Sequence, residues 1–306
     1  MAEQAREPRV IAGYDGSESA RTAVTWAARE AASRGLGLTV VQVVDWPVSD
    51  SPPPAVRLMP PAGTLLDDDT LRNQAERQVA EVTDEARQTW PGLVVGGVVE
   101  FGRAAETLVR MVGEEDLVVI GSSGRTALPR MLLGSTAAEL VHTCQRPVVV
   151  VRDAKDPSDI AGQVAGRVVV GVDGSSTSER AIGFAFDFAA RHGHELVAVY
   201  AWSNLPLEAM EPMGVWDQDP AEVGKEAEIL LAESLAGFQE RFPEVSVRRE
   251  VLFDRPAHAL VAQADGAALL VVGSHGRGAV RSVIVGSVSH AVIYHAPCPV
   301  AVVRGG

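Results

Sequence analysis

The chain has 306 residues, of which 46% are hydrophobic and 22% charged, and its formal net charge is −13. The length predicts two domains of ordinary size, and the composition excludes a disordered or fibrous protein. The acidic balance argues against nucleic acid or an anionic membrane as a partner, because both are bound through basic patches; a nucleotide can still be held locally by backbone N–H groups.

Cysteine content and hydropathy bear on the cellular compartment. The two cysteines, Cys144 and Cys298, are too few for a disulfide framework or a thiolate metal site, and the histidines show no metal-ligand spacing. No apolar run approaches the ~20 residues that span a bilayer, and the N-terminal stretch MAEQAREPR is charged. We therefore expect a cytoplasmic protein that does not insert into membranes.

The first half of the chain alternates predicted strands and helices. Runs such as LTVVQVV and PVVVV are apolar almost throughout, as in strands that helices cover on both faces. The stretch ARTAVTWAAREAASRG has alanine and valine at helical spacing and ends at Gly35, a natural C-cap. The predicted strands span 9–13, 37–45, 93–100, 116–120 and 147–151. The predicted helices span 17–34, 69–89, 104–113 and 134–144.

Two segments of the chain lack any regular pattern. PVSDSPPPAVRLMPPAG (47–63) is too rich in proline for a helix or strand, and its position after the second predicted strand suggests a lid over a site in the first half. DAKDPSDIAGQVAG (153–166) is polar and lacks apolar periodicity, so we interpret it as a linker.

The second half repeats the first. RVIAGYDGS (9–17) recurs at a 158-residue offset, whereas FGRAAETLV (101–109) and DLVVIGSSGR (116–125) recur at a 152-residue offset. The six-residue difference predicts extra residues in the first copy before Phe101, most of them in the proline-rich loop. The predicted strands span 167–171, 194–202, 245–252, 268–272 and 299–303. The predicted helices span 175–192, 220–241, 256–265 and 286–295.

This order of elements predicts a fold class and a division into domains. Each half is expected to be a doubly wound α/β domain, with a five-stranded parallel sheet and helices on both faces. The domains are expected at 1–152 and 167–306, on either side of the linker. The ligand crevice of such a sheet lies beyond the carboxyl ends of the strands, where the loops after the first and fourth strands meet.

A glycine loop follows the fourth strand of each half. Gly121-Ser122-Ser123-Gly124 precedes Gly134-Ser135-Thr136 by nine residues, and Gly273-Ser274-His275-Gly276 precedes Gly286-Ser287 by the same distance. Glycines let a ligand approach the backbone closely, and the start of the next helix offers unpaired N–H groups to an anion. The pattern predicts a phosphate cradle, although a tight turn without a ligand is the simpler alternative.

An Asp-Gly-Ser motif follows the first strand of each half, at Asp15-Gly16-Ser17 and Asp173-Gly174-Ser175. A carboxylate there would repel phosphate, so we place it near a ribose, an adenine or a Mg²⁺ ion. The alternative is a local one, because Asp and Ser are common in turns and at helix N-caps.

These motifs resemble those of the tandem universal stress proteins of the nucleotide-binding kind. The pattern Gly, two residues, Gly, nine residues, Gly, then Ser or Thr fits both halves, and the Asp-Gly-Ser motif also fits twice. The resemblance implies one ATP per half, with the phosphates and ribose on the glycine loop and the adenine near the ends of the first two strands. It also implies that the domains pair through their last strands. A homodimer of the whole chain is a further expectation.

The predicted binding residues follow from these motifs. Arg125 and Arg277 could neutralise phosphate charge or be ordinary loop arginines; Asn204 could meet a ribose hydroxyl or be a loop residue; and His275 could simply face solvent. The candidates of the first half are Gly13, Asp15, Val43, Gly121, Ser122, Ser123, Gly124, Arg125, Thr126, Gly134, Ser135 and Thr136. The candidates of the second half are Gly171, Asp173, Asn204, Gly273, Ser274, His275, Gly276, Arg277, Gly278, Gly286, Ser287, Val288 and Ser289.

Three functions remain open at this stage. The first is an ATP-binding regulator of a stress or dormancy response, which is not an enzyme. The second is a slow ATPase that uses the same sites, although the sequence offers no clear general base besides Asp15 and Asp173. The third is an interaction module that acts without nucleotide. No catalytic residue is predicted, and the expected cofactor is ATP, with Mg²⁺ near the two aspartates.

Overall fold

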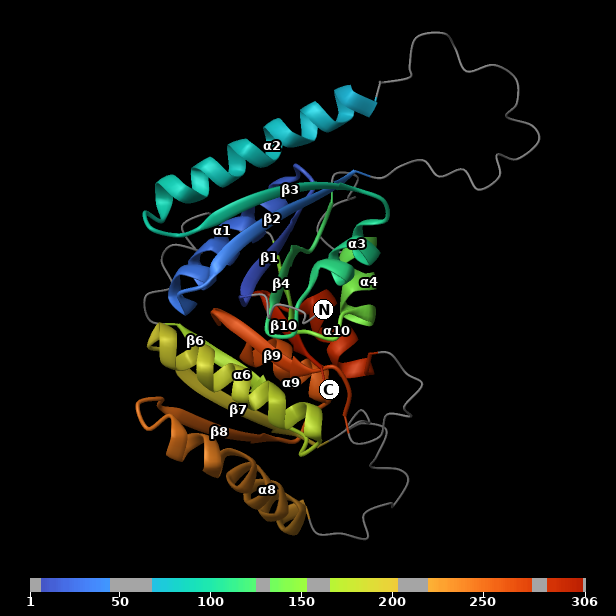
Figure 1. Ribbon diagram of the computed structural model, residues 1–306. Helices are drawn as coiled ribbons and strands as arrows, with labels where there is room; N and C mark the ends of the chain where they lie inside the picture. The colour runs from blue at the N-terminus through green and yellow to red at the C-terminus, as the bar shows by residue number, and fades with distance from the viewer. Residues whose placement is uncertain are drawn as a thin grey trace, which may run out of the picture.

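The computed structural model describes residues 7–44, 68–124, 133–152, 166–202, 220–276 and 285–304. Figure 1 shows two α/β halves that meet edge to edge. Among the described helices, none is both long and apolar enough to cross a membrane. The proline-rich loop and nearly all of the linker lie outside the described residues, so the predictions made for them stay open.

Each half contains five strands and four described helices in the predicted order. The first half consists of β1 (Arg9–Tyr14), α1 (Glu18–Arg34), β2 (Gly37–Val44), α2 (Asp68–Thr89), β3 (Val95–Phe101), α3 (Ala104–Met111), β4 (Leu117–Gly121), α4 (Ser135–Thr143) and β5 (Val148–Val151). The second half consists of β6 (Arg167–Gly171), α6 (Ser176–His192), β7 (Glu195–Ala201), α8 (Pro220–Arg241), β8 (Val247–Leu252), α9 (Pro256–Gln263), β9 (Leu269–Gly273), α10 (Ser287–His295) and β10 (Val300–Val303).

The sheet order confirms the predicted fold class. The strands run β3-β2-β1-β4-β5 in the first half and β10-β9-β6-β7-β8 in the second, with parallel pairing inside each half. The order reverses direction at β1 and at β6, so the chain winds both ways from the first strand of each half. The loops after β1 and β4 therefore lie side by side at the carboxyl edge of the sheet, where a ligand crevice is expected, and so do those after β6 and β9.

Helices cover both faces of the sheet, and each face has one apolar cluster that runs through both halves. One cluster includes Trp26 and Val79 under α1 and α2 together with Phe186 and Leu231 under α6 and α8. The other lies under α3, α4, α9 and α10. Buried strands such as VVVV at β5 supply side chains to both clusters, which explains their continuous apolar sequences.

Some element boundaries differ from the predicted ones. Helix α3 ends at Met111 rather than at residue 113, and β4 begins at Leu117 rather than at residue 116. The buried carboxylate of Asp116 explains both differences, because it accepts hydrogen bonds from the backbone N–H groups of Gly113 (2.8 Å) and Arg9 (2.9 Å). Asp116 thus stops the helix and ties the start of β4 to β1.

The extra residues of the first half lie where the repeats predicted them. Strand β7 begins 158 residues after β2 begins, which is the offset of the first motif. Helix α8 begins 152 residues after α2 begins, which is the offset of the later motifs. The insertion therefore falls between β2 and α2, the connection that contains the proline-rich sequence.

The two halves pair through their last strands, as the resemblance implied. Strands β5 and β10 are antiparallel, with Val149 opposite Ala301 at the centre, and this pairing makes one ten-stranded sheet. Each strand is followed by an arginine that reaches into the other half. Arg152 donates to the carbonyls of Ile293 (2.9 Å) and Tyr294 (2.8 Å) at the end of α10. Arg304 donates to those of Val141 and His142 at the end of α4.

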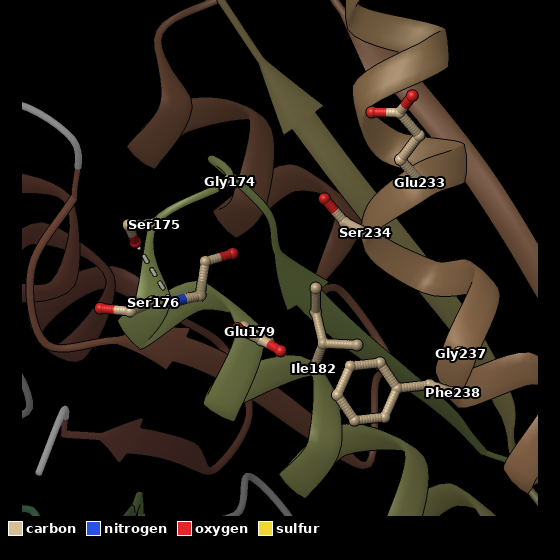
Figure 2. A pocket seen from close by; sticks show the side chains of 10 residues that line it. Gly174, Ser175, Ser176, Glu179, Ile182, Glu233, Ser234, Gly237 and Phe238 are labelled. Carbon is tan, nitrogen blue, oxygen red and sulfur yellow. Dashed lines mark hydrogen bonds between the residues drawn. The ribbon is translucent and has the colours of Figure 1, made fainter.

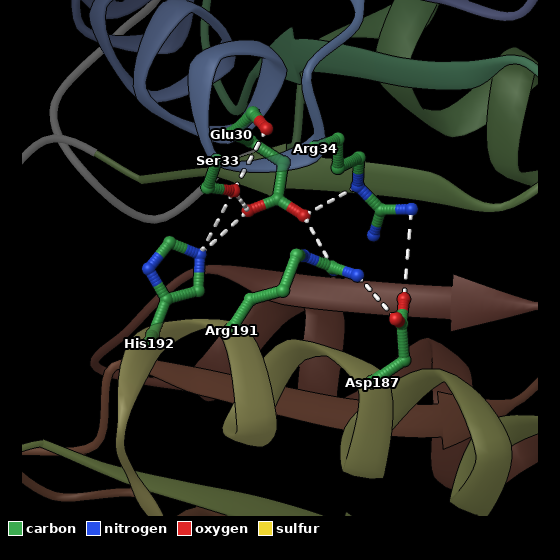
Figure 3. Close-up of polar contacts among 6 residues, drawn as sticks. All are labelled: Glu30, Ser33, Arg34, Asp187, Arg191 and His192. Carbon is green, nitrogen blue, oxygen red and sulfur yellow. Dashed lines mark hydrogen bonds and ion pairs between the residues drawn. The ribbon is translucent and has the colours of Figure 1, made fainter.

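A buried ionic cluster joins α1 to α6 on one face of this sheet (Figure 3). Glu30 is only 1% exposed, and its Oε1 lies 2.6 Å from Arg34 Nε and 3.0 Å from Arg191 Nη2. Its Oε2 lies 2.8 Å from His192 Nε2. Burial by itself would raise the pKa of Glu30, but the hydrogen bond with His192 and the charges of Arg34 and Arg191 lower that pKa to about 2.

The cluster is asymmetric although the two helices are repeats of each other. The 158-residue offset also relates α1 to α6, so the position of Glu30 corresponds to Phe188, whose ring stacks on Trp26 with centroids 6.0 Å apart. The same offset relates Arg191 and His192 to Ser33 and Arg34 of the first half. A first half paired with its own copy would keep a cation at the position of His192 but lose the guanidinium of Arg191, so the observed pairing gives Glu30 the more complete set of partners.

Replacing Glu30 by glutamine is expected to lower the free energy of unfolding at pH 7 by about 3 kcal/mol, because Arg34 and Arg191 lose their buried countercharge. The difference from the wild type should persist above pH 4.5, the ordinary pKa of the carboxyl, and disappear as the pH falls toward about 2. Urea denaturation at several pH values measures this.

The matched control for that change is Glu106→Gln, which breaks the exposed pair of Arg103 and Glu106. An exposed pair contributes about 0 to 1 kcal/mol, so this variant should stay close to the wild type. Equal effects of the two substitutions would contradict the role given to Glu30.

Candidate functional site

The Asp-Gly-Ser motifs form matching turns at the carboxyl ends of β1 and β6. Asp15 Oδ1 accepts a hydrogen bond from the Ser17 N–H (2.9 Å), and Ser17 Oγ accepts one from the Ala20 N–H (3.1 Å) as the N-cap of α1. Gly16 has a φ of 84°, which favours glycine. The local interpretation of this motif, an N-cap and turn, is thus confirmed for Ser17 and for one oxygen of Asp15.

The second half repeats this turn. Asp173 Oδ1 lies 2.9 Å from the Ser175 N–H and 2.7 Å from Ser175 Oγ, and Ser175 is the N-cap of α6. Gly174 has a φ of 75°. The two aspartates therefore take equivalent positions at the edge of the two crevices.

The glycine loop of each half is closed by backbone hydrogen bonds. The Ser122 N–H donates to Val151 O (2.8 Å), and Ser122 O accepts from the Gly134 N–H (2.8 Å). In the second half the Ser274 N–H donates to Val303 O (2.8 Å), and Ser274 O accepts from the Gly286 N–H (2.7 Å). The start of each loop is thereby held against the last strand and against the end of the same loop.

Each glycine loop passes directly beside the aspartate of its own half. A Cβ added to Gly124 would lie 3.0 Å from Asp15 Oδ2, and one added to Gly276 would lie 2.5 Å from Asp173 Oδ2. A larger residue at either position would therefore have to displace the carboxylate. The structure thus brings the two sequence motifs together in both halves.

The first glycine of each loop has a different role. A Cβ on Gly121 would lie 2.7 Å from Ser19 Oγ and 2.8 Å from the Ser19 carbonyl carbon. On Gly273 it would lie 3.0 Å from Thr177. These glycines let α1 and α6 pack on the ends of β4 and β9, so they support the crevice through the fold.

The loop ends at the N-terminus of α4 or α10. Gly134 is the N-cap of α4, with φ −61° and ψ 150°, and it offers no side chain to the amides of the first turn. The first helical hydrogen bond runs from the Ala138 N–H to Gly134 O (2.9 Å), so the amides of Ser135 and Thr136 precede it. Gly286 is the N-cap of α10 in the same way. Each crevice therefore contains the positive end of a helix dipole, which suits an anion.

Several predicted site residues face the core instead of the crevice. A Cβ on Gly13 would point at Leu108 and Ile120, and one on Gly171 at Leu260, so these glycines make room for side-chain packing and not for a base or ribose. Ser289 is buried, and its hydroxyl donates to Gly273 O (2.5 Å). In this structure the hydroxyl of Ser289 is thus bonded to the backbone of β9, and its predicted contact with phosphate stays a prediction.

Five other predicted site residues contact the core or hold the glycine loop in place. Val43 and Val288 are partly buried against the cluster under α3, α4, α9 and α10. Ser122 and Ser274 are 7% and 1% exposed and anchor the loop through their backbones. His275 is partly buried, with Nδ1 2.9 Å from Ser274 Oγ, rather than fully exposed.

The remaining predicted site residues lie outside the described residues. These are Arg125, Thr126, Asn204, Arg277 and Gly278. Their predicted roles stay open. Within the described ranges no group of three or more His, Cys, Asp or Glu side chains could hold a metal ion, so any Mg²⁺ would depend on phosphate oxygens for most of its ligands.

Sequence reasoning missed one pair of residues that position the loop. Ser19 Oγ accepts from the Ser123 N–H (3.3 Å), and Thr177 Oγ1 donates to His275 O (2.5 Å). Ser19 and Thr177 occupy the same place in α1 and α6. The available signal was a hydroxyl side chain two residues after the Asp-Gly-Ser motif in both copies.

Comparisons with known proteins agree with this geometry. The signature of the universal stress protein family matches residues 8–152 and again residues 165–304. A universal stress protein of Mycobacterium tuberculosis (strain H37Rv) is 41% identical over 304 residues, which cover 99% of both chains. One of Mycolicibacterium smegmatis is 38% identical over 99% of both chains. The crystal structure of a universal stress protein from Archaeoglobus fulgidus has a TM-score of 0.70 at 20% identity, and the match covers 97% of this chain and 98% of that one.

Replacing Gly121 by alanine is expected to lower the free energy of unfolding by about 2 to 3 kcal/mol, because the new methyl group overlaps the backbone of α1. Gly134→Ala is the matched control, since its Cβ would meet nothing closer than 3.6 Å. Its effect should be about 1 kcal/mol or less. Chemical denaturation of both variants measures the difference, and equal destabilisation would contradict the packing role of Gly121.

Proposed function

Because the chain belongs to the universal stress protein family and carries the family domain twice, we propose that it binds one ATP in each half. The observation that carries this proposal is the meeting of three features in each crevice: the glycine loop, the aspartate after the first strand, and a helix N-terminus without a side-chain cap. A helix N-terminus favours phosphate, and glycines give the ligand access to backbone N–H groups.

Each part of the crevice has its own task in this proposal. The first-turn amides of α4 and α10 and the hydroxyls of Ser135 and Ser287 bind the triphosphate. Asp15 and Asp173 already accept a backbone hydrogen bond in the turn, and their second oxygens lie beside the loop glycines. They are placed to accept from ribose hydroxyls or adenine, or to meet a Mg²⁺ ion carried by the triphosphate.

The two sites should not bind ATP equally. Thr136 offers a hydroxyl at the second position of α4, whereas the corresponding residue of α10 is Val288, which packs against the core. Ser123 is likewise replaced by His275, whose ring bonds to Ser274. We therefore propose that the first half binds ATP more tightly than the second.

We propose a regulatory role rather than a catalytic one. Each aspartate already accepts a backbone hydrogen bond inside its own turn, which accounts for its position without any part in proton transfer. ATP occupancy would then set the conformation or the partner choice of the protein in a stress response. Turnover of ATP by the purified protein, lost in the Asp15→Asn/Asp173→Asn variant, would favour the slow ATPase instead.

Replacing Ser135 by glutamate is expected to abolish ATP binding in the first half without destabilising the fold. A carboxylate at the start of α4 favours the helix dipole but repels the triphosphate. Equilibrium dialysis should find two ATP per chain in the wild type and one in the Ser135→Glu variant, at an unchanged or higher Tm. Ser287→Glu should remove the other site.

The matched control is Ser135→Gln, which has the same size as the glutamate variant without its charge. It should retain two ATP per chain with at most a modest loss of affinity. The proposal fails if the wild type binds no ATP, or if both Ser135 variants lose it alike because size and not charge decides.

A further inference from the structure

A pocket of about 390 Å³ lies between α6 and α8, beside the turn that carries Asp173 (Figure 2). Its lining includes serine hydroxyls and an apolar wall, and the carboxylates of Glu179 and Glu233, both exposed, stand on opposite sides of it. The lining residues on which the inference rests are Ser175, Glu179, Ile182, Glu233, Gly237 and Phe238. Glu179 comes from α6 and Glu233 from α8, so acidic side chains approach the pocket from both helices.

The corresponding place in the first half is occupied by an arginine of the chain itself. Arg21 of α1 reaches α2, where its guanidinium forms a short hydrogen bond with Glu85 and lies 3.8 Å from Glu81. The pKa of Arg21 is raised, chiefly by the hydrogen bond with Glu85. A guanidinium thus links the two helices that cover the edge of the first half.

The repeats identify what changed in the second half. The 158-residue offset between α1 and α6 places Glu179 at the position of Arg21. The 152-residue offset between α2 and α8 places Glu233 at that of Glu81 and Gly237 at that of Glu85. The second half has therefore exchanged the cation for a carboxylate, kept one acid on α8 and lost the side chain that would fill the space.

The pocket in the second half therefore has two carboxylates, and no cation is among the described residues that line it. Among the described residues neither Glu179 nor Glu233 forms an ion pair, whereas Glu81 and Glu85 both face Arg21. Ile182 and Phe238 lie side by side as an apolar wall in Figure 2. The helix dipole of α6 explains a glutamate at position 179, because that residue lies in the first turn. The dipole does not explain why α8 has a glycine at position 237 or a carboxylate at position 233.

We propose that this pocket binds a guanidinium cation carried on a short aliphatic chain, in the place that Arg21 fills in the first half. The planar guanidinium pairs with the carboxylates of Glu179 and Glu233, and the aliphatic chain packs on Ile182 and Phe238. The cation comes either from a free alkylguanidine or from an arginine side chain of a partner. This binding does not depend on nucleotide.

The test measures binding of agmatine to the full chain, without nucleotide, by isothermal titration calorimetry. Agmatine and butylguanidine should bind, whereas butylurea, which differs from butylguanidine only in lacking the charged guanidinium, should not. The Glu179→Gln/Glu233→Gln variant should lose at least about tenfold in affinity, since two charge-assisted hydrogen-bond partners are removed. Absence of agmatine binding to the wild type at up to ~10 mM would overturn the proposal.

Two further variants separate binding from folding. Glu179→Arg/Gly237→Glu recreates the Arg21–Glu85 pair in the second half, and it should abolish agmatine binding while maintaining or raising the Tm. Arg21→Glu/Glu85→Gly opens the same space in the first half and should add a second agmatine site. Retained binding in the first of these variants would contradict the proposal.

A blocked peptide with a single arginine distinguishes the two sources of the cation. Tighter binding of agmatine indicates a free alkylguanidine, and tighter binding of the peptide indicates a partner's arginine. Loss of either interaction in the Glu179→Gln/Glu233→Gln variant supports this pocket as the site, and its persistence there would refute it.

Discussion

The antiparallel pairing of β5 with β10 is the constraint on which the rest of the structure depends. Both strands are apolar on both faces, so either one left at a sheet edge would expose unpaired backbone and valine side chains. Their pairing also places Arg152 and Arg304 at the ends of the helices of the opposite half. The residues just before these arginines, Val151 and Val303, accept the hydrogen bonds that anchor the glycine loops. The interface and the two crevices are thus built from the same strands.

Duplication within one chain has let the two halves diverge where two identical domains could not. Glu30 faces Arg191 and His192 across the interface because the second half has these residues where the first half has Ser33 and Arg34. The same freedom separates the crevices, where Thr136 corresponds to Val288. It also allowed the helix pair that Arg21 bridges in the first half to become an acidic pocket in the second. Each difference follows from a few substitutions on an unchanged order of strands and helices.

Much of the fold could be predicted from the sequence, because its signals are local and occur twice. Strand periodicity, the C-cap at Gly35 and the offset of the repeats were sufficient for the element order and the sheet class, whereas the pairing of the last strands was expected from the family resemblance. Predictions were weaker where a distant side chain decides. The hydrogen bond from the Arg9 N–H to Asp116 joins residues 107 positions apart, and the burial of Glu30 depends on Arg191 and His192, which come from the other half of the chain.

The same distinction explains the glycines. The spacing of the glycines showed where the loops are, but it did not show which glycine lies at the ligand site and which allows elements to pack. Gly13 and Gly121 allow packing, while Gly124 lies beside Asp15.

The central claim is that both crevices bind ATP, and native mass spectrometry of the full chain with ATP tests it most directly. We expect chains with one and two ATP, with the two-ATP state dominant at saturation. Chains that carry none at any ATP concentration would contradict the claim.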